Sequence, residues 1–251
     1  MICEPVMTDP MPTPPAAEAA PAQKGGFLSN LLFNIVIPVV ILTKFSQESA
    51  LGPVWSIVVA LAFPVAFGLW EMRVTGKVNG FSILGVVSVL LTGGISLLQL
   101  DPKYIAIKEA AIPGLIGLAV IVSQGSHRSV VKMLIFNDKI IQIGRVHDAL
   151  AKLGNKAKFD QKMSIVTYIV ASSFFLSSAL NYMLAKLVLK SPAGTSQFNE
   201  ELGRMTALSY PVIVIPSMIV LVGAVWYLLA QLKALTKLPL DDLMVDSSKK
   251  S

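Results

Sequence analysis

Charged residues and cysteines are scarce in this chain, and each scarcity excludes a class of protein. Only 14% of the 251 residues are Asp, Glu, Lys or Arg, whereas soluble domains carry roughly 25%. The single cysteine, Cys3, excludes an internal disulfide framework and a cysteine-based zinc site. The composition therefore indicates a membrane protein.

Catalytic and cofactor motifs are also lacking. The sequence has no phosphate-binding glycine loop, no nucleophile elbow and no arrangement typical of a Ser-His-Asp triad. Its two histidines, His127 and His147, have no HExxH-type pattern for a metal ion. We therefore predict that the protein is not an enzyme and that it holds no cofactor and no metal.

The first 26 residues lack the basic start and apolar core of a signal peptide. They are rich in Pro and Ala and carry Glu4, Asp9 and Glu18. Because proline does not propagate a helix and the segment has little apolar surface to bury, we predict that 1–26 is a disordered cytoplasmic tail. A Pro-rich docking peptide is the alternative interpretation.

Long apolar runs are what the chain has in abundance. Six stretches of close to twenty residues cover 27–45, 51–70, 80–100, 104–123, 163–189 and 207–232. A helix needs about 20 apolar residues to cross a hydrocarbon core of about 30 Å, and unbroken apolar runs favour helices over barrel strands. We predict an all-α fold, a polytopic transmembrane bundle of about six membrane-spanning helices within residues 27–232.

Lys and Arg gather on one side of these predicted spans. That side carries Lys24, Arg73, Lys77, Arg128, Lys132, Lys139, Arg145, Lys152, Lys156, Lys158, Lys162, Lys233, Lys237, Lys249 and Lys250. The opposite loops carry only Lys44, Lys103, Lys190 and Arg204. The positive-inside rule therefore predicts that both termini are cytoplasmic. Because the net charge of +6 is concentrated in loops between spans, we predict no nucleic-acid partner.

The basic segment 124–162 forms the longest predicted cytoplasmic loop. Apolar residues recur in it at helical spacing, at Val130, Val131, Leu134, Ile135, Ile141, Val146, Leu150 and Leu153. An amphipathic segment of this kind either lies in the headgroup region of an anionic leaflet or forms a solvated helical connector, and the sequence leaves both open. Phe136, Asn137 and Asp138 predict a turn within it. Residues 233–251 form the predicted cytoplasmic C-terminal tail.

The runs NLLFNIVIPVVILTKFS, LGPVWSIVVALAFPVAFGLWE, FDQKMSIVTYIVASSFFLSSALNYMLAKLV and FNEELGRMTALSYPVIVIP resemble the intracellular septation protein A group. More closely, the chain resembles a related bacterial family of unknown function whose members are labelled septation-protein-like or transporters. The resemblance covers residues 27–232. It implies a bacterial inner-membrane protein connected with the cell envelope or with division, and it supplies no catalytic residue.

Lys108 and Glu109 lie inside a predicted span, near its periplasmic end, and ionisable residues in a bilayer are candidate functional positions. Adjacent helical residues point about 100° apart, so we expect these two charges to have different partners. Pro113 shares a face with Glu109 and frees its carbonyl group. One interpretation is a periplasm-facing polar pocket for a proton or a small charged group. The other is that Lys108 snorkels to the interface and Glu109 pairs with a neighbouring helix.

A second polar cluster surrounds the loop between the last two predicted spans. It contains Asn181, Lys186, Glu200, Glu201 and Arg204. We expect Asn181 to bridge helices and Glu201 to meet Arg204 at i,i+3 spacing. One hypothesis places this cluster opposite Lys108 and Glu109 across the outer leaflet, and the alternative is a set of exposed loop charges.

Two functional hypotheses follow. The first is a non-enzymatic inner-membrane protein that organises the cell envelope or takes part in division, with the lipid bilayer, envelope or division proteins and a second copy of the chain as expected partners. The alternative is a transporter or channel for a small solute or ion, with its polar site near Lys108 and Glu109. An intramembrane enzyme is disfavoured by the missing motifs.

Overall fold

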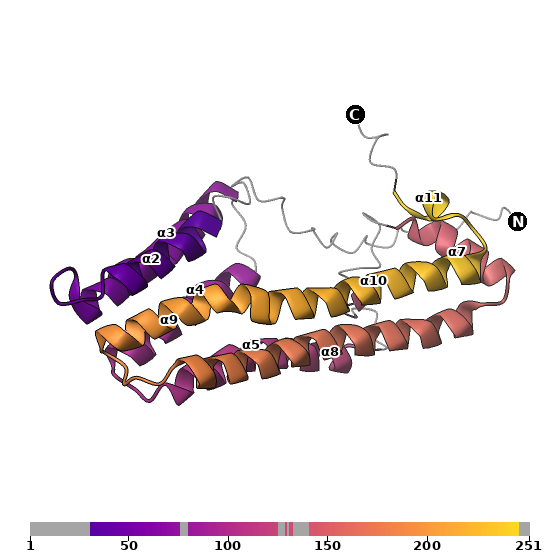
Figure 1. Ribbon diagram of the computed structural model, residues 1–251. Helices are drawn as coiled ribbons and strands as arrows, with labels where there is room; N and C mark the ends of the chain where they lie inside the picture. The colour runs from indigo at the N-terminus through magenta and orange to yellow at the C-terminus, as the bar shows by residue number, and fades with distance from the viewer. Residues whose placement is uncertain (1–30, 76–79, 125–128, 130, 133–140, 246–251) are drawn as a thin grey trace, which may run out of the picture.

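The computed structural model describes residues 31–75, 80–124, 129, 131–132 and 141–245, and it is helical throughout this part of the chain (Figure 1). The elements are η1 (Leu32–Val36), α2 (Ile37–Lys44), α3 (Gly52–Thr75), α4 (Gly80–Leu97), α5 (Lys103–Val122), α7 (Ile143–Lys152), α8 (Lys156–Val188), α9 (Ser196–Ser209), η2 (Tyr210–Val214), α10 (Ile215–Thr236) and α11 (Leu240–Leu243). The only strand-like pairing among the described residues is an isolated bridge between Ile141 and Met244. The predicted all-α class is therefore confirmed for the described residues.

Each predicted apolar stretch lies in or overlaps a helix. Among the described residues, four helices are long and apolar enough to cross a membrane, namely Gly52–Val74, Lys103–Val122, Lys156–Val188 and Ser196–Thr236. Two further apolar helices, Leu32–Lys44 and Leu84–Leu97, are shorter. The structure thus shows a helical chain with four apolar helices of membrane-spanning length. A count of six spans remains a prediction.

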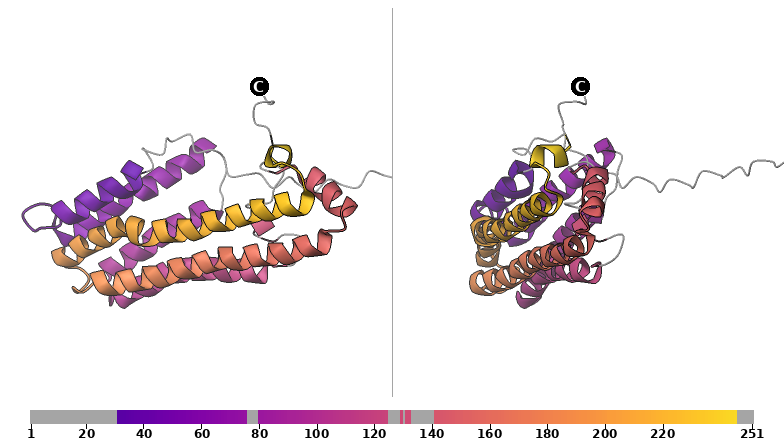
Figure 2. Two further views of the ribbon diagram at one scale, coloured as in Figure 1. Left: turned by 45° about the vertical axis from the view of Figure 1, so that its right-hand side comes forward. Right: turned by 90° about the vertical axis from the view of Figure 1, so that its right-hand side faces the viewer.

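The long helices run antiparallel along an elongated bundle (Figures 1 and 2). Helix α8 packs against α5 and against α10, while α2 packs against α9 and α3, and α3 packs against α4. At one end the connecting loops meet, because the Ser196 hydroxyl donates to the Ser46 carbonyl at 2.7 Å and Gly194 lies against the Gln99 side chain. We call this the loop end. The opposite end, where α7 and α11 lie, is the basic end.

Two hydrophobic cores hold the bundle together. The core at the loop end joins α2, α3, α5, α8 and α9 through buried residues that include Leu42, Ile57, Ile105, Leu184 and Phe198. The core at the basic end joins α5, α7, α8, α10 and α11 and includes Val120, Val146, Leu150, Val166 and Leu228. Packing at both ends therefore fixes the long helices relative to one another.

The described part of segment 124–162 takes part in the basic-end core. Helix α7 is amphipathic, and its Val146 and Leu150 are fully buried in that core. Helix α11 lies beside the start of α7, since the backbone amide of Gln142 donates to the Leu243 carbonyl at 2.8 Å. The turn predicted at 136–138 and the tail predicted at 1–26 lie outside the described residues.

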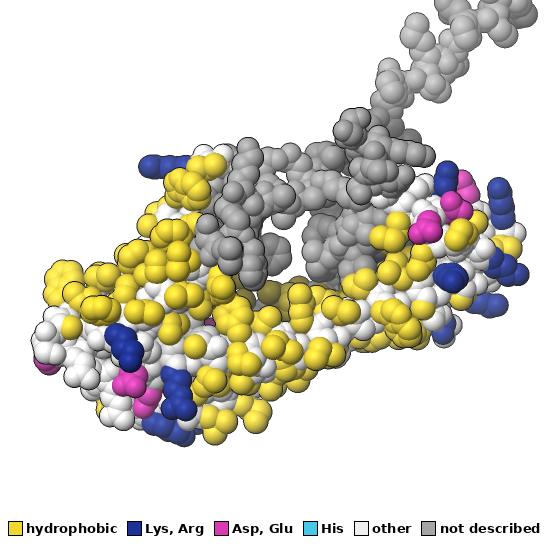
Figure 3. Space-filling model, turned by 45° about the horizontal axis from the view of Figure 1, so that its top comes forward, with side chains coloured by type: hydrophobic (Ala, Val, Ile, Leu, Met, Phe, Trp, Pro, Cys, Tyr) yellow, Lys and Arg dark blue, Asp and Glu magenta, His cyan; other side chains and the backbone are white. Residues whose placement is uncertain are grey.

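Between its two ends the outer surface of the bundle is apolar. Lys, Arg, Asp and Glu side chains gather at the two ends, and hydrophobic side chains cover the face between them (Figure 3). Large exposed apolar residues include Trp55, Leu115, Leu187, Ile219 and Trp226. A continuous apolar surface of this size marks contact with a membrane or a partner rather than with water. Together with the four long apolar helices, it indicates membrane association.

Two π-helical turns, η1 and η2, each stand just before a proline. The Ile37 amide donates to the Leu32 carbonyl and the Ile215 amide to the Tyr210 carbonyl, and Pro38 and Pro216 follow directly. Proline has no N–H to continue the α-helical hydrogen-bond ladder, and a single π turn absorbs the local mismatch. Both helices therefore continue past their prolines.

Candidate functional site

Lys108 is a buried lysine in the apolar body of the bundle, with a relative exposure of 8%. Helix α5 carries it against the antiparallel helix α4. Its ammonium group donates to Thr92 Oγ1 at 2.7 Å, to Ser88 Oγ at 3.1 Å and to Ser88 O at 3.4 Å. It also forms an ion pair with Glu109 Oε1 at 2.6 Å. An ammonium group has three donor protons, and this site supplies a partner for each.

The direction of the Lys108 side chain excludes the interpretation that it snorkels to the loop end. Thr92 and Ser88 lie at i,i+4 spacing on α4, so they share a face, and Ser88 is one turn further from the loop end. Ser88 is nine residues, about 13 Å, from the last residue of α4. The ammonium group of Lys108 is thus held well inside the bundle.

The expectation that Lys108 and Glu109 need different partners is wrong. The angle of about 100° between neighbouring helical positions describes where the Cβ atoms point. A lysine stem has four methylene groups and can bend its ammonium group back to the adjacent carboxylate. The Glu109 side chain, with 26% exposure, is more accessible than that of Lys108.

Pro113 lies inside α5, one turn after Glu109. The Ser178 hydroxyl on α8 donates to the Ala110 carbonyl at 2.7 Å, next to the backbone position that the proline leaves without its helical donor. A Cβ added at Gly114 would lie 3.2 Å from the same hydroxyl. The glycine therefore allows α5 and α8 to approach closely beside the Lys108 site.

The second predicted cluster is not assembled into one site. Asn181 donates to the Ser177 carbonyl of its own helix at 2.8 Å, and Arg204 is exposed. Lys186 is also exposed and lines a shallow cavity of about 260 Å³ at the loop end, together with Asp101 and Lys190. The hypothesis that this cluster faces Lys108 and Glu109 is therefore not what the geometry shows.

Glu201 binds the loop between α8 and α9 instead of Arg204. One carboxylate oxygen accepts the backbone amides of Lys190 at 2.8 Å and Ser191 at 2.9 Å. The other accepts the Ser191 hydroxyl at 2.8 Å. Hydrogen bonds to a charged acceptor are stronger than neutral ones, so this carboxylate fixes the path of the chain between the two longest helices.

Asp101 lies two residues before the first residue of α5, at the loop end. Its carboxylate accepts the Lys103 backbone amide at 2.8 Å and pairs with the Lys103 ammonium group at 3.3 Å. The hydrogen bond from this amide holds the pKa of Asp101 below its usual value. The Asp101 side chain is 53% exposed, so its role is to order the start of the helix rather than to form a buried site.

A buried polar network that the sequence analysis missed lies under the loop end. Asn199, with 0% exposure, donates to the Pro53 carbonyl at 2.8 Å and to Ser56 Oγ at 3.0 Å. Ser46 donates to Ser56 at 2.9 Å. The network joins α9 to the start of α3 and, through Ser46, to the turn between α2 and α3. Its only sequence signal is an uncharged polar residue on the apolar face of Phe198 and Leu202.

Within the described residues, no group of three or more His, Cys, Asp or Glu side chains is placed to hold a metal ion. Comparisons of the chain with protein-family models, with curated proteins and with solved structures find no match.

Proposed function

We propose that this chain is a multi-pass protein of the bacterial inner membrane, with both termini in the cytoplasm and a non-enzymatic role in cell-envelope organisation or division. Its four long apolar helices and its apolar outer surface support the membrane location. The distribution of Lys and Arg supports the orientation. The resemblance of residues 27–232 to the intracellular septation protein A group supports the role.

The hydrogen-bonded state of Lys108 is the observation that favours a structural role over transport. A site that binds a passing solute keeps polar groups available for it. Here Glu109, Thr92 and Ser88 already occupy the donors of the ammonium group. Such an arrangement joins α4 to α5 as a polar contact between membrane helices does.

Complementation of a deletion strain tests this proposal. The double variant Lys108→Met, Glu109→Gln removes both charges without leaving either one unpaired. We expect it to reach the membrane fraction and to restore normal cell shape and division, as scored by microscopy. A variant that is inserted normally and fails to complement would contradict a purely structural role for the pair.

The alternative function is a transporter or channel for a small ion or solute, and one observation favours it. Glu109 is partly accessible, and an accessible carboxylate inside a predicted span is a candidate site for a proton or a small ion. Purified protein in proteoliposomes with an internal pH-sensitive dye tests this function. Proton flux that is present in the natural chain and absent in Glu109→Gln would support transport and displace the structural proposal.

A further inference from the structure

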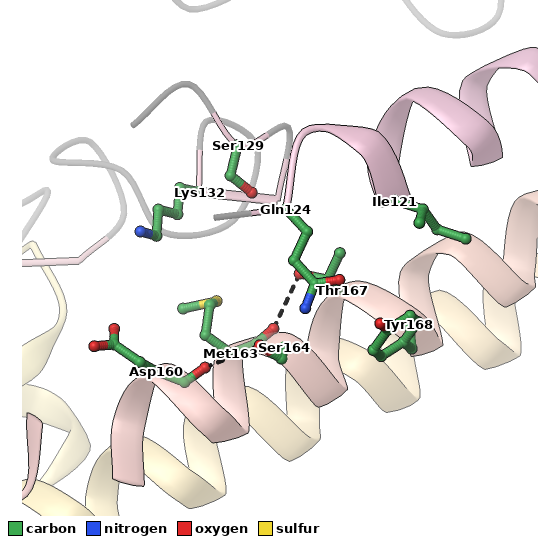
Figure 4. A pocket seen from close by; sticks show the side chains of 9 residues that line it. All are labelled: Ile121, Gln124, Ser129, Lys132, Asp160, Met163, Ser164, Thr167 and Tyr168. Carbon is green, nitrogen blue, oxygen red and sulfur yellow. Dashed lines mark hydrogen bonds between the residues drawn. The ribbon is translucent and has the colours of Figure 1, made fainter. Parts of the chain in front are cut away.

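The basic end holds a cavity of about 720 Å³ between α8 and the end of α5 (Figure 4), within the roughly 300–1,000 Å³ of small-molecule sites. One wall is a single face of α8, with residues at i, i+3, i+4, i+7 and i+8, namely Asp160, Met163, Ser164, Thr167 and Tyr168. The other wall consists of Ile121, Gln124, Ser129 and Lys132.

The cavity changes from charged to apolar along its length. Lys132 and Asp160 lie at one end, and Ile121 and Tyr168 lie at the other (Figure 4). Asp160 and Tyr168 are eight residues apart, about 12 Å along α8. The apolar run of α8 starts at Met163, so the cavity spans the change from charged to apolar surface. In a membrane protein, this is the depth of the lipid headgroups.

Several polar groups in the cavity have no partner in the described part of the chain. These are the ammonium group of Lys132, the carboxylate of Asp160 and the hydroxyl of Ser129. Ser129 is only 3% exposed and lines the cavity together with Lys132, while Asp160 is exposed. A bound polar ligand would therefore find a cation, an anion and a hydroxyl group in one cavity.

We propose that this cavity binds the headgroup of a zwitterionic phospholipid that carries a primary amine, of the phosphoethanolamine type. The lipid phosphate binds Lys132 and Ser129, the lipid ammonium group binds Asp160, and the start of an acyl chain lies against Ile121 and Tyr168. One cation and one anion in the lining match a ligand with one phosphate and one ammonium group. The site depends on the membrane location proposed above, but not on the envelope role.

The chemistry of the lining discriminates among headgroups. A glycerol headgroup offers a phosphate without a cation, so it leaves Asp160 unpaired beside a negative charge. A choline headgroup carries a cation that has no N–H donor, so it forms no hydrogen bond with the Asp160 carboxylate. A primary ammonium group supplies both the positive charge and the N–H donors that the Asp160 carboxylate can bind.

Native mass spectrometry of the full chain, released from nanodiscs with equal amounts of phosphatidylethanolamine, phosphatidylglycerol and phosphatidylcholine of identical acyl chains, tests the proposal. We expect retained phosphatidylethanolamine to exceed each other lipid about tenfold, as one charge-assisted hydrogen bond predicts. Asp160→Asn should reduce the preference over phosphatidylcholine to near equality, and Lys132→Gln should lower retention of all three lipids. The control variants Asp148→Asn and Lys158→Gln change exposed charges outside the cavity and should retain the preference.

Carbonate extraction of the cell membranes from which the chain is purified distinguishes a failure of the lipid site from a failure of the membrane location. A chain that remains in the membrane and retains no excess phosphatidylethanolamine overturns the lipid site alone. Preferential retention of phosphatidylglycerol, or a phosphatidylethanolamine preference that Asp160→Asn leaves intact, also overturns it. A chain extracted from the membrane overturns the membrane location and the lipid site together.

Discussion

The buried position of Lys108 constrains how α4 and α5 pack against each other. A lysine removed from water loses its hydration, and the loss is tolerable only when its donors are satisfied. Ser88 and Thr92 supply neutral acceptors, and Glu109 supplies the opposite charge. The three groups come from two helices, so the lysine also fixes how α4 and α5 meet.

Removal of one member of the Lys108–Glu109 pair should destabilise the protein more than removal of both. Lys108→Met leaves the Glu109 carboxylate without its cation, and we expect it to lower the free energy of unfolding by about 3 kcal/mol. The double variant Lys108→Met, Glu109→Gln should lose less than Lys108→Met alone, because it leaves no charge unpaired, and the coupling energy should be at least about 1 kcal/mol. Reversible unfolding in mixed micelles measures all three variants. Additive losses would show that the two side chains do not interact.

The lowered pKa of Asp101 predicts that the start of α5 is sensitive to acid. Its pKa lies below the usual value because its carboxylate accepts the Lys103 amide. A lowered pKa in the folded state means that the contribution to stability is complete above the pKa of the unfolded chain, and it is lost as the pH falls through the folded value. Carboxyl ¹³C titration by NMR should give a midpoint below the usual range, and the Lys103 amide shift should follow it. A midpoint at or above the usual value would contradict the contact.

At the residue scale, the sequence identified Lys108 and Glu109 because ionisable side chains are rare in apolar stretches. It did not identify Ser88 and Thr92, since hydroxyl residues are ordinary in membrane helices and bond to their own backbone. Which hydroxyls face the lysine depends on how two helices pair. Their i,i+4 spacing was visible in the sequence, but the pairing was not.

At the scale of elements, α2 and α10 begin in the same way, because each follows a π-helical turn and the same short sequence. The run Ile-Val-Ile-Pro, at 35–38 and 213–216, spans the junction of η1 with α2 and that of η2 with α10. In both, the π turn closes on the residue before the proline. Proline commonly kinks a helix, whereas here a change of hydrogen-bond register keeps each helix continuous.

Gly203 sets the contact between α9 and α2. A Cβ added there would lie 2.9 Å from Thr43 Cγ2 and 3.2 Å from Leu42 Cβ. We therefore expect Gly203→Ala to destabilise the protein by about 1–3 kcal/mol through overpacking. Gly223→Ala on α10 is the matched control, because nothing lies within 4 Å of its added Cβ, and it should stay within about 0.5 kcal/mol of the natural chain. Equal thermal stabilities of the two variants would contradict this close approach.

The hydrogen bonds of Glu201 predict that its replacement destabilises the protein more than replacement of the adjacent Glu200. Glu201→Ala removes the acceptor for two backbone amides and the Ser191 hydroxyl, so we expect a loss of about 2 kcal/mol. Glu200→Ala changes an exposed side chain and should be nearly neutral. Hydrogen exchange at the amides of Lys190 and Ser191 measures the effect directly. Unchanged protection in Glu201→Ala would show that the carboxylate does not hold this loop.

The helices themselves were predictable, and their docking was not. Length and unbroken hydrophobicity located the long helices, because a span must satisfy its own backbone hydrogen bonds. The sequence left α7 as either an interfacial or a solvated segment, whereas Val146 and Leu150 in fact join the basic-end core. An amphipathic pattern shows which face of a helix is apolar but not which neighbour covers it.

At the scale of the whole molecule, charge is separated along the long axis. Basic residues concentrate at the end formed by α7 and the first turns of α8, and the apolar surface lies between the two ends (Figure 3). The loops after α2, α4 and α8 share the loop end through contacts at Ser46 and Gln99. For the multi-pass topology that we propose, this arrangement predicts one orientation, with the basic end on the cytoplasmic side.

Cysteine accessibility tests this orientation and the number of spans together, since the chain has a single natural cysteine. In a Cys3→Ser background, single cysteines at Ser49, Leu98 and Lys190 should react with an impermeant maleimide in intact spheroplasts. Cysteines at Asp148 and Lys156 should react only after permeabilisation. The natural Cys3 distinguishes six spans from fewer, because it lies on the cytoplasmic side only if the helix Leu32–Lys44 crosses the bilayer. Labelling of Cys3 in intact spheroplasts would mean that this short helix does not cross, and labelling of Lys156→Cys there would reverse the predicted orientation.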